Sequence, residues 1–272
     1  MRRQLQSAEE IWRAYDEDEL RLTAGLSERM LELAALRPGM RVLDLATGRG
    51  EPAIRAAHRV APGGSVLGVD PSQAMLDMAR ARALREGVSN LELRCAGAEA
   101  LEATGTFDAV LVRWGLMYLD APVAALEAAR RVMASHAVLV AALWVEPERA
   151  SYFTLPRRVL ERYRPLPPID PDAPGTFRYA DLARTERDLA AAGLGITHVE
   201  DIEVDVMEAA TDEALIAWTR AFGLTRLLND LPEATQRAWE EALVREVEPL
   251  RRGGVVRLGG VTRLVVASRD AR

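Results

Sequence analysis

Two acidic residues and two glycines in this chain stand at a spacing that suits a ligand containing a ribose. Asp44 ends an apolar run rich in branched side chains, and Gly48 and Gly50 follow it in a tight turn. Glycine lets the backbone turn sharply and approach a ligand closely. Asp70 lies 20 residues after Gly50 (70 − 50), where a carboxylate can bind the two hydroxyls of a ribose. These residues indicate a site for a nucleoside-containing cofactor.

The elements around these residues must place both acids at one edge of a sheet. Residues 41–50 read as a strand followed by a tight loop, and residues 51–60 as a helix with Pro52 in its first turn. Residues 65–70 read as a second strand that ends in Asp70. The N–H groups at a helix N-terminus favour an anionic ligand group. A structural turn without a ligand is the alternative, and the two placed acids count against it.

Two cofactors fit this pattern. Gly48-x-Gly50-x-x-Ala53 matches the dinucleotide fingerprint, so an NAD-dependent oxidoreductase is one interpretation. The other cofactor is S-adenosylmethionine (SAM). The stretch resembles motif I of class I SAM-dependent methyltransferases, in which an acid after an apolar strand precedes three spaced glycines. Asp44 takes the acidic place, Gly48 and Gly50 take the last two glycine places, and Ala46 replaces the first glycine.

The resemblance continues downstream and implies further site residues. Arg113-Trp-Gly-Leu-Met is similar to small-molecule methyltransferases of the ubiquinone and natural-product type. The family usually has Asp at the place of Gly97, where adenine is held, and Glu99 could supply the carboxylate instead. The implied cofactor-binding residues are Tyr15, Asp44, Ala46, Thr47, Gly48, Gly50, Asp70, Pro71, Met75, Gly97, Ala98, Glu99 and Arg113. The implied acceptor-binding residues are Trp12, Trp114, Met117, Tyr118, Tyr152 and Phe153, for which core packing is the alternative.

The alternation of strands and helices predicts an α/β fold with a Rossmann-like, seven-stranded, mostly parallel sheet, helices on both faces and a helical cap. Residues 196–207 and 261–268 should form its reversed last strands. The pattern breaks down after Val145, and five prolines within residues 165–174 predict a stiff extended loop. The expected domains are an N-terminal helical lid (1–36), a SAM-binding domain (37–207 and 259–272) and a helical cap insertion (208–258). A static cover of the sheet edge is the alternative to the lid.

Composition narrows the class of protein. The chain has 272 residues, of which 49% are apolar and 28% charged, as in globular proteins. No window suits a membrane span, the N-terminus lacks a signal-like apolar core, and the single cysteine, Cys95, excludes an internal disulfide. These features favour the cytoplasm. The net charge of −6 argues against a nucleic-acid partner, and a homodimer is left open.

The chemistry that the resemblance implies is in-line methyl transfer from a sulfonium. Orientation of donor and acceptor can supply roughly 7–11 kcal/mol of the barrier. No lysine occurs, and His58, His136 and His198 lie at no recognisable base position, so no catalytic residue is assigned. No cluster of metal ligands stands out. We expect metal-independent transfer to a small, largely hydrophobic acceptor of the natural-product or quinone type. The alternatives are the NAD-dependent oxidoreductase and a catalytically silent SAM-binding protein.

Overall fold

The structure is a computed structural model that describes residues 8–101, 103 and 105–269, without the side chains of residues 8–14, 222–223 and 225–226. The chain divides into two compact units. The sheet unit comprises Ala24–Glu146, Asp170–Ile202 and Thr262–Arg272, and the helical unit comprises Met1–Thr23, Pro147–Ile169 and Glu203–Val261. Residues 24–36 thus group with the sheet, and residues 147–169 group with the helices.

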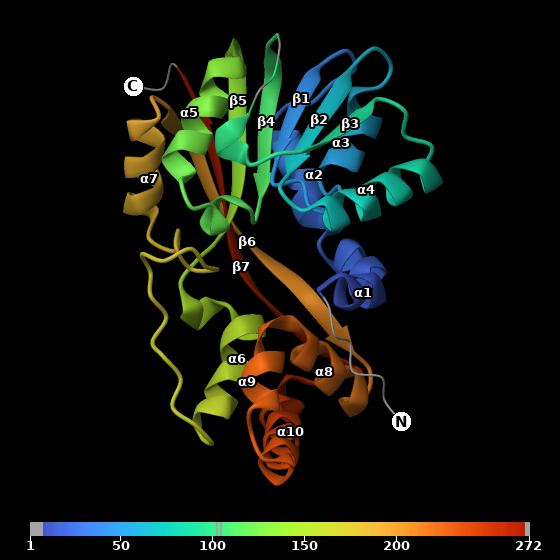
Figure 1. Cartoon of the computed structure of the whole chain (residues 1–272), viewed down its shortest axis with the longest axis vertical. Helices are drawn as coiled ribbons and strands as arrows, with labels where there is room; N and C mark the ends of the chain where they lie inside the picture. The colour runs from blue at the N-terminus through green and yellow to red at the C-terminus, as the bar shows by residue number, and fades with distance from the viewer. Residues whose placement is uncertain (1–7, 102, 104, 270–272) are drawn as a thin grey trace. The chain divides into compact units, whose positions relative to one another are not determined.

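Seven strands form one sheet in the order β3-β2-β1-β4-β5-β7-β6. The strands are β1 Arg41–Leu45, β2 Ser65–Asp70, β3 Leu91–Cys95, β4 Phe107–Arg113, β5 Met133–Trp144, β6 Gly195–Ala209 and β7 Val256–Ser268. Strands β1 to β5 pair in parallel, and β7 pairs antiparallel with β5. The predicted mostly parallel α/β sheet with a reversed strand near its end is therefore confirmed (Figure 1).

The central strands are apolar because helices cover both of their faces. Val42, Leu43 and Leu45 of β1 have no exposed surface, and the same holds for residues 109–112 of β4. Asp44 is paired in register with Gly68 of β2 and with Leu111 of β4. Because these strands are parallel, their carboxyl ends meet at one edge of the sheet, which is where open α/β sheets bind ligands.

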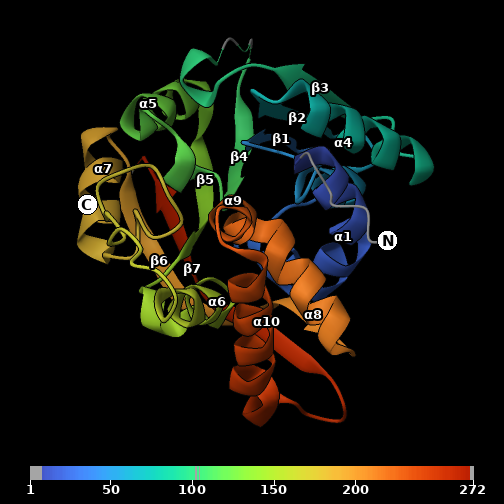
Figure 2. The same ribbon diagram turned by 60° about the horizontal axis from the view of Figure 1, so that its bottom comes forward.

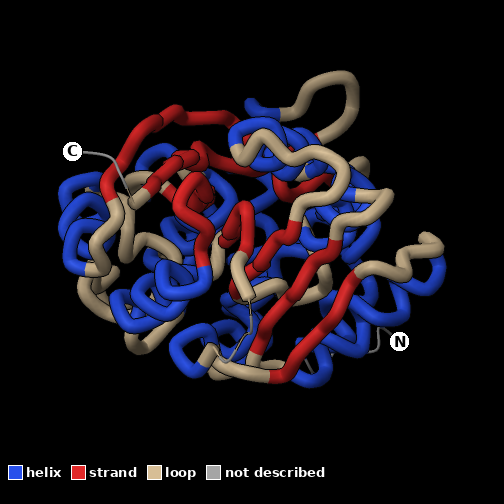
Figure 3. Tube along the Cα trace, turned by 90° about the horizontal axis from the view of Figure 1, so that it is seen from above, coloured by secondary structure: helices blue, strands red, loops and turns tan. Residues whose placement is uncertain are grey.

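The helices of the sheet unit lie on both sides of the strands (Figure 3). They are α2 Ala24–Leu33, α3 Ala53–Val60, α4 Gln73–Arg85, α5 Pro122–Val132 and α7 Leu182–Ala191. Ser72 is the N-cap of α4, since its hydroxyl accepts a hydrogen bond from the N–H of Met75. The single-turn helices of this unit are Ala98–Ala100 and Leu116–Tyr118.

The helical unit has its own apolar core around Leu215, Trp218 and Trp239. Its helices are α1 Ala8–Leu22, α6 Ser151–Glu161, α8 Asp212–Thr219, α9 Thr225–Asn229 and α10 Glu233–Val247, with short turns at Pro147–Arg149, Arg220–Leu224 and Glu248–Leu250. Figure 2 shows α6, α8 and α10 of this unit. The sequence did not predict α6, which contains Pro156; the indole N–H of Trp239 donates to the carbonyl of that proline.

Among the residues that the structure describes, no helix is both long enough and apolar enough to cross a membrane.

Candidate functional site

The loop between β1 and α3 has the backbone conformation that only glycine adopts freely. Ala46, Gly48 and Gly50 have φ angles of +53°, +53° and +86°. A Cβ added at Gly50 would lie 2.8 Å from the Ile54 side chain, so packing also requires glycine there. A Cβ added at Gly48 would meet nothing within 4 Å. Open space therefore lies beside the Gly48 backbone, as a bound cofactor would need.

The side chain of Ala46 limits the size of the residue at position 115, in the loop after β4. A Cβ added at Gly115 would lie 2.5 Å from the Cβ of Ala46, closer than two carbon atoms can approach. The loop after β4 therefore lies directly against the loop after β1. The methyl group at Ala46, where methyltransferases have glycine, fits because Gly115 has no side chain.

Asp70 is held by two backbone donors. The N–H of Gly48 donates to Oδ2 at 2.9 Å, and the N–H of Ser72 donates to Oδ1 at 2.8 Å. The residue is 9% exposed. Each carboxylate oxygen can accept a further hydrogen bond, so the side chain is already oriented to receive two ribose hydroxyls. This geometry fits a nucleoside cofactor.

Asp44 is fully buried beneath the same loop. The Thr47 hydroxyl donates to its Oδ2 at 2.6 Å, whereas Oδ1 is buried without a hydrogen-bond partner among the described residues. Burial raises the pKa of Asp44 to about 7, against the opposing effects of the Thr47 hydroxyl and the Arg113 guanidinium. A buried carboxylate with one oxygen free of a close hydrogen bond fits a ligand that brings a donor or a positive charge.

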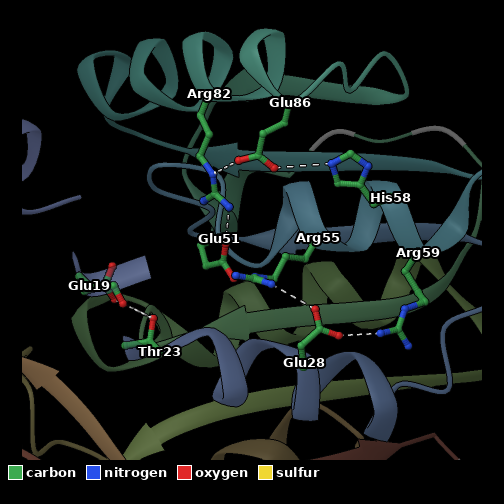
Figure 4. A network of polar contacts seen from close by, with 9 residues as sticks. All are labelled: Glu19, Thr23, Glu28, Glu51, Arg55, His58, Arg59, Arg82 and Glu86. Atoms are coloured by element: carbon green, nitrogen blue, oxygen red, sulfur yellow. Dashed lines mark hydrogen bonds and ion pairs between the residues drawn. The ribbon is translucent and has the colours of Figure 1, made fainter. Parts of the chain in front are cut away.

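A network of ion pairs fixes the helix that begins behind the loop (Figure 4). Glu51 contacts Arg82 of α4 at 2.8 Å and Arg55 of α3 at 2.7 Å. Glu28 of α2 contacts Arg55 at 3.2 Å and Arg59 at 2.6 Å. The network thus joins α2, α3 and α4 around the N-terminus of α3.

Arginine side chains determine the electrostatics around Arg49 and Glu51. Burial alone would raise the pKa of Glu51, but Arg113, Arg82 and Arg55 hold it below its ordinary value. Burial, together with repulsion from Arg113 and Arg82, lowers the pKa of Arg49 to about 9. The glycine loop is therefore set in a cationic environment, which favours an anionic group of a ligand.

The predicted adenine loop lies next to Asp70, because the N–H of Ala96 donates to the Asp70 carbonyl at 3.1 Å. A Cβ added at Gly97 would lie 2.7 Å from Oε1 of Glu99. The Glu99 carboxylate thus occupies the space that a side chain at residue 97 would take. Ala98 is buried between them. The thiol of Cys95 lies 3.5 Å from the Pro71 carbonyl, which brings the loops after β2 and β3 together.

The predicted acceptor residues after β4 differ in exposure. Trp114 has φ +52°, stacks on Trp144 with 4.7 Å between ring centres and donates from Nε1 to the Thr262 hydroxyl at 3.1 Å. The Arg113 guanidinium lies 4.8 Å from the Trp114 ring centre. Met117 is fully buried and supports the loop, whereas Tyr118 is 51% exposed. Tyr118 is therefore the residue of these three whose side chain a ligand reaches most readily.

The remaining predicted residues lie in the helical unit. The rings of Tyr15 and Trp218 are 4.5 Å apart, and the Trp218 indole N–H donates to the Tyr152 hydroxyl at 3.3 Å. The rings of Tyr152 and Phe153 are 4.8 Å apart. The structure thus places Tyr15 and Tyr152 against Trp218, with Phe153 against Tyr152. Trp12 lies on α1, and its side chain is outside the described part of the chain.

Each histidine pairs with a carboxylate. The ring nitrogens of His58, His136 and His198 lie 3.6, 3.1 and 2.9 Å from Glu86, Asp108 and Glu200, respectively. His136 and Asp108 stand at the amino ends of the strands, away from the glycine loop. Within residues 8–101, 103 and 105–269, no group of three or more histidine, cysteine or acidic residues could hold a metal ion.

Sequence reasoning did not assign Ser72, Gly115 and Thr262 to the site. Ser72 follows Asp70 by two residues and caps α4. Its position at the start of a helix could have indicated that its N–H is the second donor to the Asp70 carboxylate. Gly115 stands inside the Arg113-Trp-Gly-Leu-Met stretch, but only the contact with Ala46 reveals why it is glycine. Thr262 contacts Trp114 across 148 positions of sequence, so no local pattern indicates it.

The sheet order and the acid-and-glycine loop define a Rossmann-like protein that binds a nucleoside cofactor. Residues 42–136 match the family described as methyltransferase domain. The chain is 28% identical to the nocamycin O-methyltransferase of Saccharothrix syringae, over 89% of this chain and 90% of that protein. It is 37% identical to the ubiquinone/menaquinone biosynthesis C-methyltransferase UbiE of Shewanella frigidimarina over 38% of this chain, and spans only 42% of that relative.

The solved structure of a SAM-dependent methyltransferase from Aquifex aeolicus has the same fold, with a TM-score of 0.55 and 22% identity over 74% of this chain and 94% of that one. The methyltransferase match over residues 42–136 and the relatives named as methyltransferases together support a SAM-dependent methyltransferase of the small-molecule type, with SAM as its cofactor. The predicted recognition, enzyme class and cofactor are confirmed, and neither the oxidoreductase nor the catalytically silent binding protein is favoured.

Proposed function

We propose that the protein transfers the methyl group of SAM to a small, largely hydrophobic acceptor of the natural-product or quinone type. The observation that carries the cofactor half of this proposal is the Asp70 carboxylate, oriented by the N–H groups of Gly48 and Ser72 beside the open space at Gly48. The relatives named for nocamycin and for ubiquinone and menaquinone support the acceptor half.

In this proposal, different residues of the sheet unit bind different parts of SAM. Asp70 accepts from the ribose hydroxyls, and Glu99 accepts from the adenine amino group in place of the acid missing at Gly97. The second oxygen of Asp44 accepts from the methionine end. Arg113 balances the charge of Asp44, while Ala46, Thr47 and Gly50 shape the loop and Pro71, Met75 and Ala98 line the adenosine.

SAM supplies an electrophilic methyl group on a sulfonium, and the protein supplies orientation. We propose that transfer is in line and independent of a metal, with no general base assigned. Positioning the acceptor opposite the departing sulfur and excluding water are then the main contributions of the chain. Trp12, Trp114, Met117, Tyr118, Tyr152 and Phe153 remain the proposed acceptor residues, with Met117 acting from beneath the loop.

We also propose that the protein acts in the cytoplasm, on a free small molecule and not on a nucleic acid or a membrane. The acidic net charge of −6 and the single, exposed Cys95 support this. A homodimer stays open.

Calorimetry and isotope transfer test the proposed function. S-adenosylhomocysteine (SAH), the demethylated product, should bind with micromolar affinity, and NAD should not bind at the same concentration. SAM labelled in its methyl group should then label a member of a panel of naphthoquinols, phenols and enolic amides, equally with and without EDTA. Binding of NAD in preference to SAH would refute the cofactor half. Labelling of nucleic acid alone would refute the acceptor half.

A further inference from the structure

Two segments that lie far apart in the sequence form one surface of the sheet unit. The N–H of Gly175 donates to the Met117 carbonyl at 3.0 Å, and Arg178 donates to the Leu119 carbonyl. Between these two contacts the hydroxyls of Tyr118 and Thr176 lie 3.0 Å apart, within hydrogen-bond distance. The second half of the proline-rich crossing is therefore attached to the loop after β4.

The crossing is fixed on both sides of Thr176. Before it, Asp172 forms an ion pair with Arg184 of α7 at 2.5 Å. After it, Tyr179 is fully buried and donates to Asp188 of α7 at 2.6 Å. The hydroxyl pair is thus held in place without a ligand, which reduces the ordering cost of binding one.

The backbone that carries Tyr118 continues from the residue that packs against the cofactor loop. Gly115 lies against Ala46, and the carbonyl of Gly115 accepts from the N–H of Tyr118 at 3.0 Å. The Tyr118 backbone is therefore one helical turn away from Gly115, which contacts the loop that follows β1. Half of the surface of Tyr118 is exposed at this edge, although its hydroxyl already has a partner.

Two adjacent hydroxyls offer a ligand a definite set of hydrogen bonds. When one hydroxyl donates to the other, the pair keeps one O–H donor and several unused lone pairs. It can donate to an oxygen atom of a ligand and can accept from a ligand hydroxyl. The ring of Tyr118 adds an apolar face next to this polar point.

We propose that the Tyr118–Thr176 hydroxyl pair binds a phenol, enol or carbonyl oxygen of the acceptor, and that Thr176 is a specificity-determining residue. The inference rests on the proposed function, because Tyr118 is one of the acceptor residues proposed there. It extends that function by naming the oxygen functional group that the acceptor must carry and the atoms that receive it.

Fluorine NMR with two matched probes tests this inference on the full chain saturated with SAH. The probes are 4-fluorophenol and fluorobenzene, which differ by one hydroxyl. The wild type should prefer 4-fluorophenol by about fivefold, as one neutral hydrogen bond allows. Thr176→Val and Tyr118→Phe should each reduce that preference to nearly one. Thr176→Ser should restore it, and Ser89→Ala, on an exposed turn, should leave it unchanged.

Two results would overturn the inference while leaving the proposed function intact. One is SAH binding without any preference between the two probes. The other is a preference that survives both Thr176→Val and Tyr118→Phe. Failure of SAH to bind the wild type would count against the proposed function itself. SAH affinity measured for every variant shows that a lost preference does not come from unfolding.

Discussion

At the scale of single residues, the site depends on backbone donors that orient acidic side chains. Asp70 receives two N–H groups from two different loops, one from Gly48 and one from Ser72. A side chain that is already hydrogen-bonded loses little freedom when a ligand arrives. Gly48 combines this N–H contact with a left-handed backbone conformation, φ +53°.

Replacing Asp70 tests this arrangement. Asp70→Ala should weaken SAM binding by about 2–4 kcal/mol, since hydrogen bonds to a charged group contribute about 1.5–3 kcal/mol each and partly compensate. Calorimetry with SAH measures the loss, and circular dichroism checks that the variant folds. Asp77→Ala, an exposed acid on α4, is the matched control and should bind normally. A folded Asp70→Ala variant with unchanged affinity would remove Asp70 from the site.

Asp44 should make stability depend on pH. Its pKa rises from an ordinary value of 3.8 to about 7 on folding, chiefly through burial. The folded state then keeps a proton that the unfolded state releases, so the stability contributed by this group is present at low pH and is lost as the pH rises toward 7. The loss is about 1.4 kcal/mol per pH unit within that window.

Urea unfolding of the wild type and of Asp44→Asn at pH 5 and pH 8 measures this effect. Because asparagine does not titrate, the variant should gain on the order of 2–3 kcal/mol relative to the wild type between the two conditions. A stability difference that is the same at both pH values would show that Asp44 stays ionised when buried.

At the scale of elements, the buried ion pair between Glu51 and Arg82 positions the helix behind the glycine loop. Their side chains are only 3% and 6% exposed. Removing one partner of a buried pair costs about 3–5 kcal/mol when the other is left alone. Arg55 also contacts Glu51, and Glu86 also contacts Arg82, so a smaller loss follows here.

We predict that Arg82→Met destabilises the protein by about 2–3 kcal/mol and that Arg82→Met combined with Glu51→Gln recovers part of this loss. Thermal and urea unfolding measure both. Arg237→Met breaks an exposed ion pair with Glu233 and should cost at most about 0.5 kcal/mol. Equal effects of Arg82→Met and Arg237→Met would mean that the network in Figure 4 contributes little to the fold.

Local patterns predicted the elements that carry their own signals. Apolar runs bounded by glycine predicted β1 and β2, and Pro52 in the first turn predicted the start of α3. The helix α6 was missed because Pro156 interrupts its pattern and because its apolar side chains pack in a separate core. Thr176 was missed for a different reason: its partner Tyr118 is 58 positions away, and nothing in the sequence near either residue indicates the pairing.

At the scale of the whole molecule, the chain crosses between its two units several times, and each unit has its own core. The proposed cofactor residues other than Tyr15 all lie in the sheet unit. The prediction from the sequence that residues 1–36 form a lid stays untested, and residues 8–23 and 24–36 belong to different units.

Hydrogen exchange with and without SAH tests the lid. Exchange should slow at residues 41–50, 65–75 and 95–101, because ligand binding stabilises the loops that contact it. If the lid prediction is right, exchange in residues 8–36 slows as well. Slowing confined to the three loops would make the N-terminal helices a permanent cover. Residues 233–247 of α10 serve as the internal reference.

The contact between Ala46 and Gly115 constrains how this protein can have diverged from its relatives. A methyl group at one position excludes any side chain at the other, because the two Cβ atoms would lie 2.5 Å apart. The two positions should therefore vary as a pair across homologous sequences. A homologue with glycine in place of Ala46 is free to carry alanine or serine in place of Gly115, whereas one that keeps alanine must keep the glycine. An ancestral line that exchanged one residue before the other must have passed through the glycine–glycine pair.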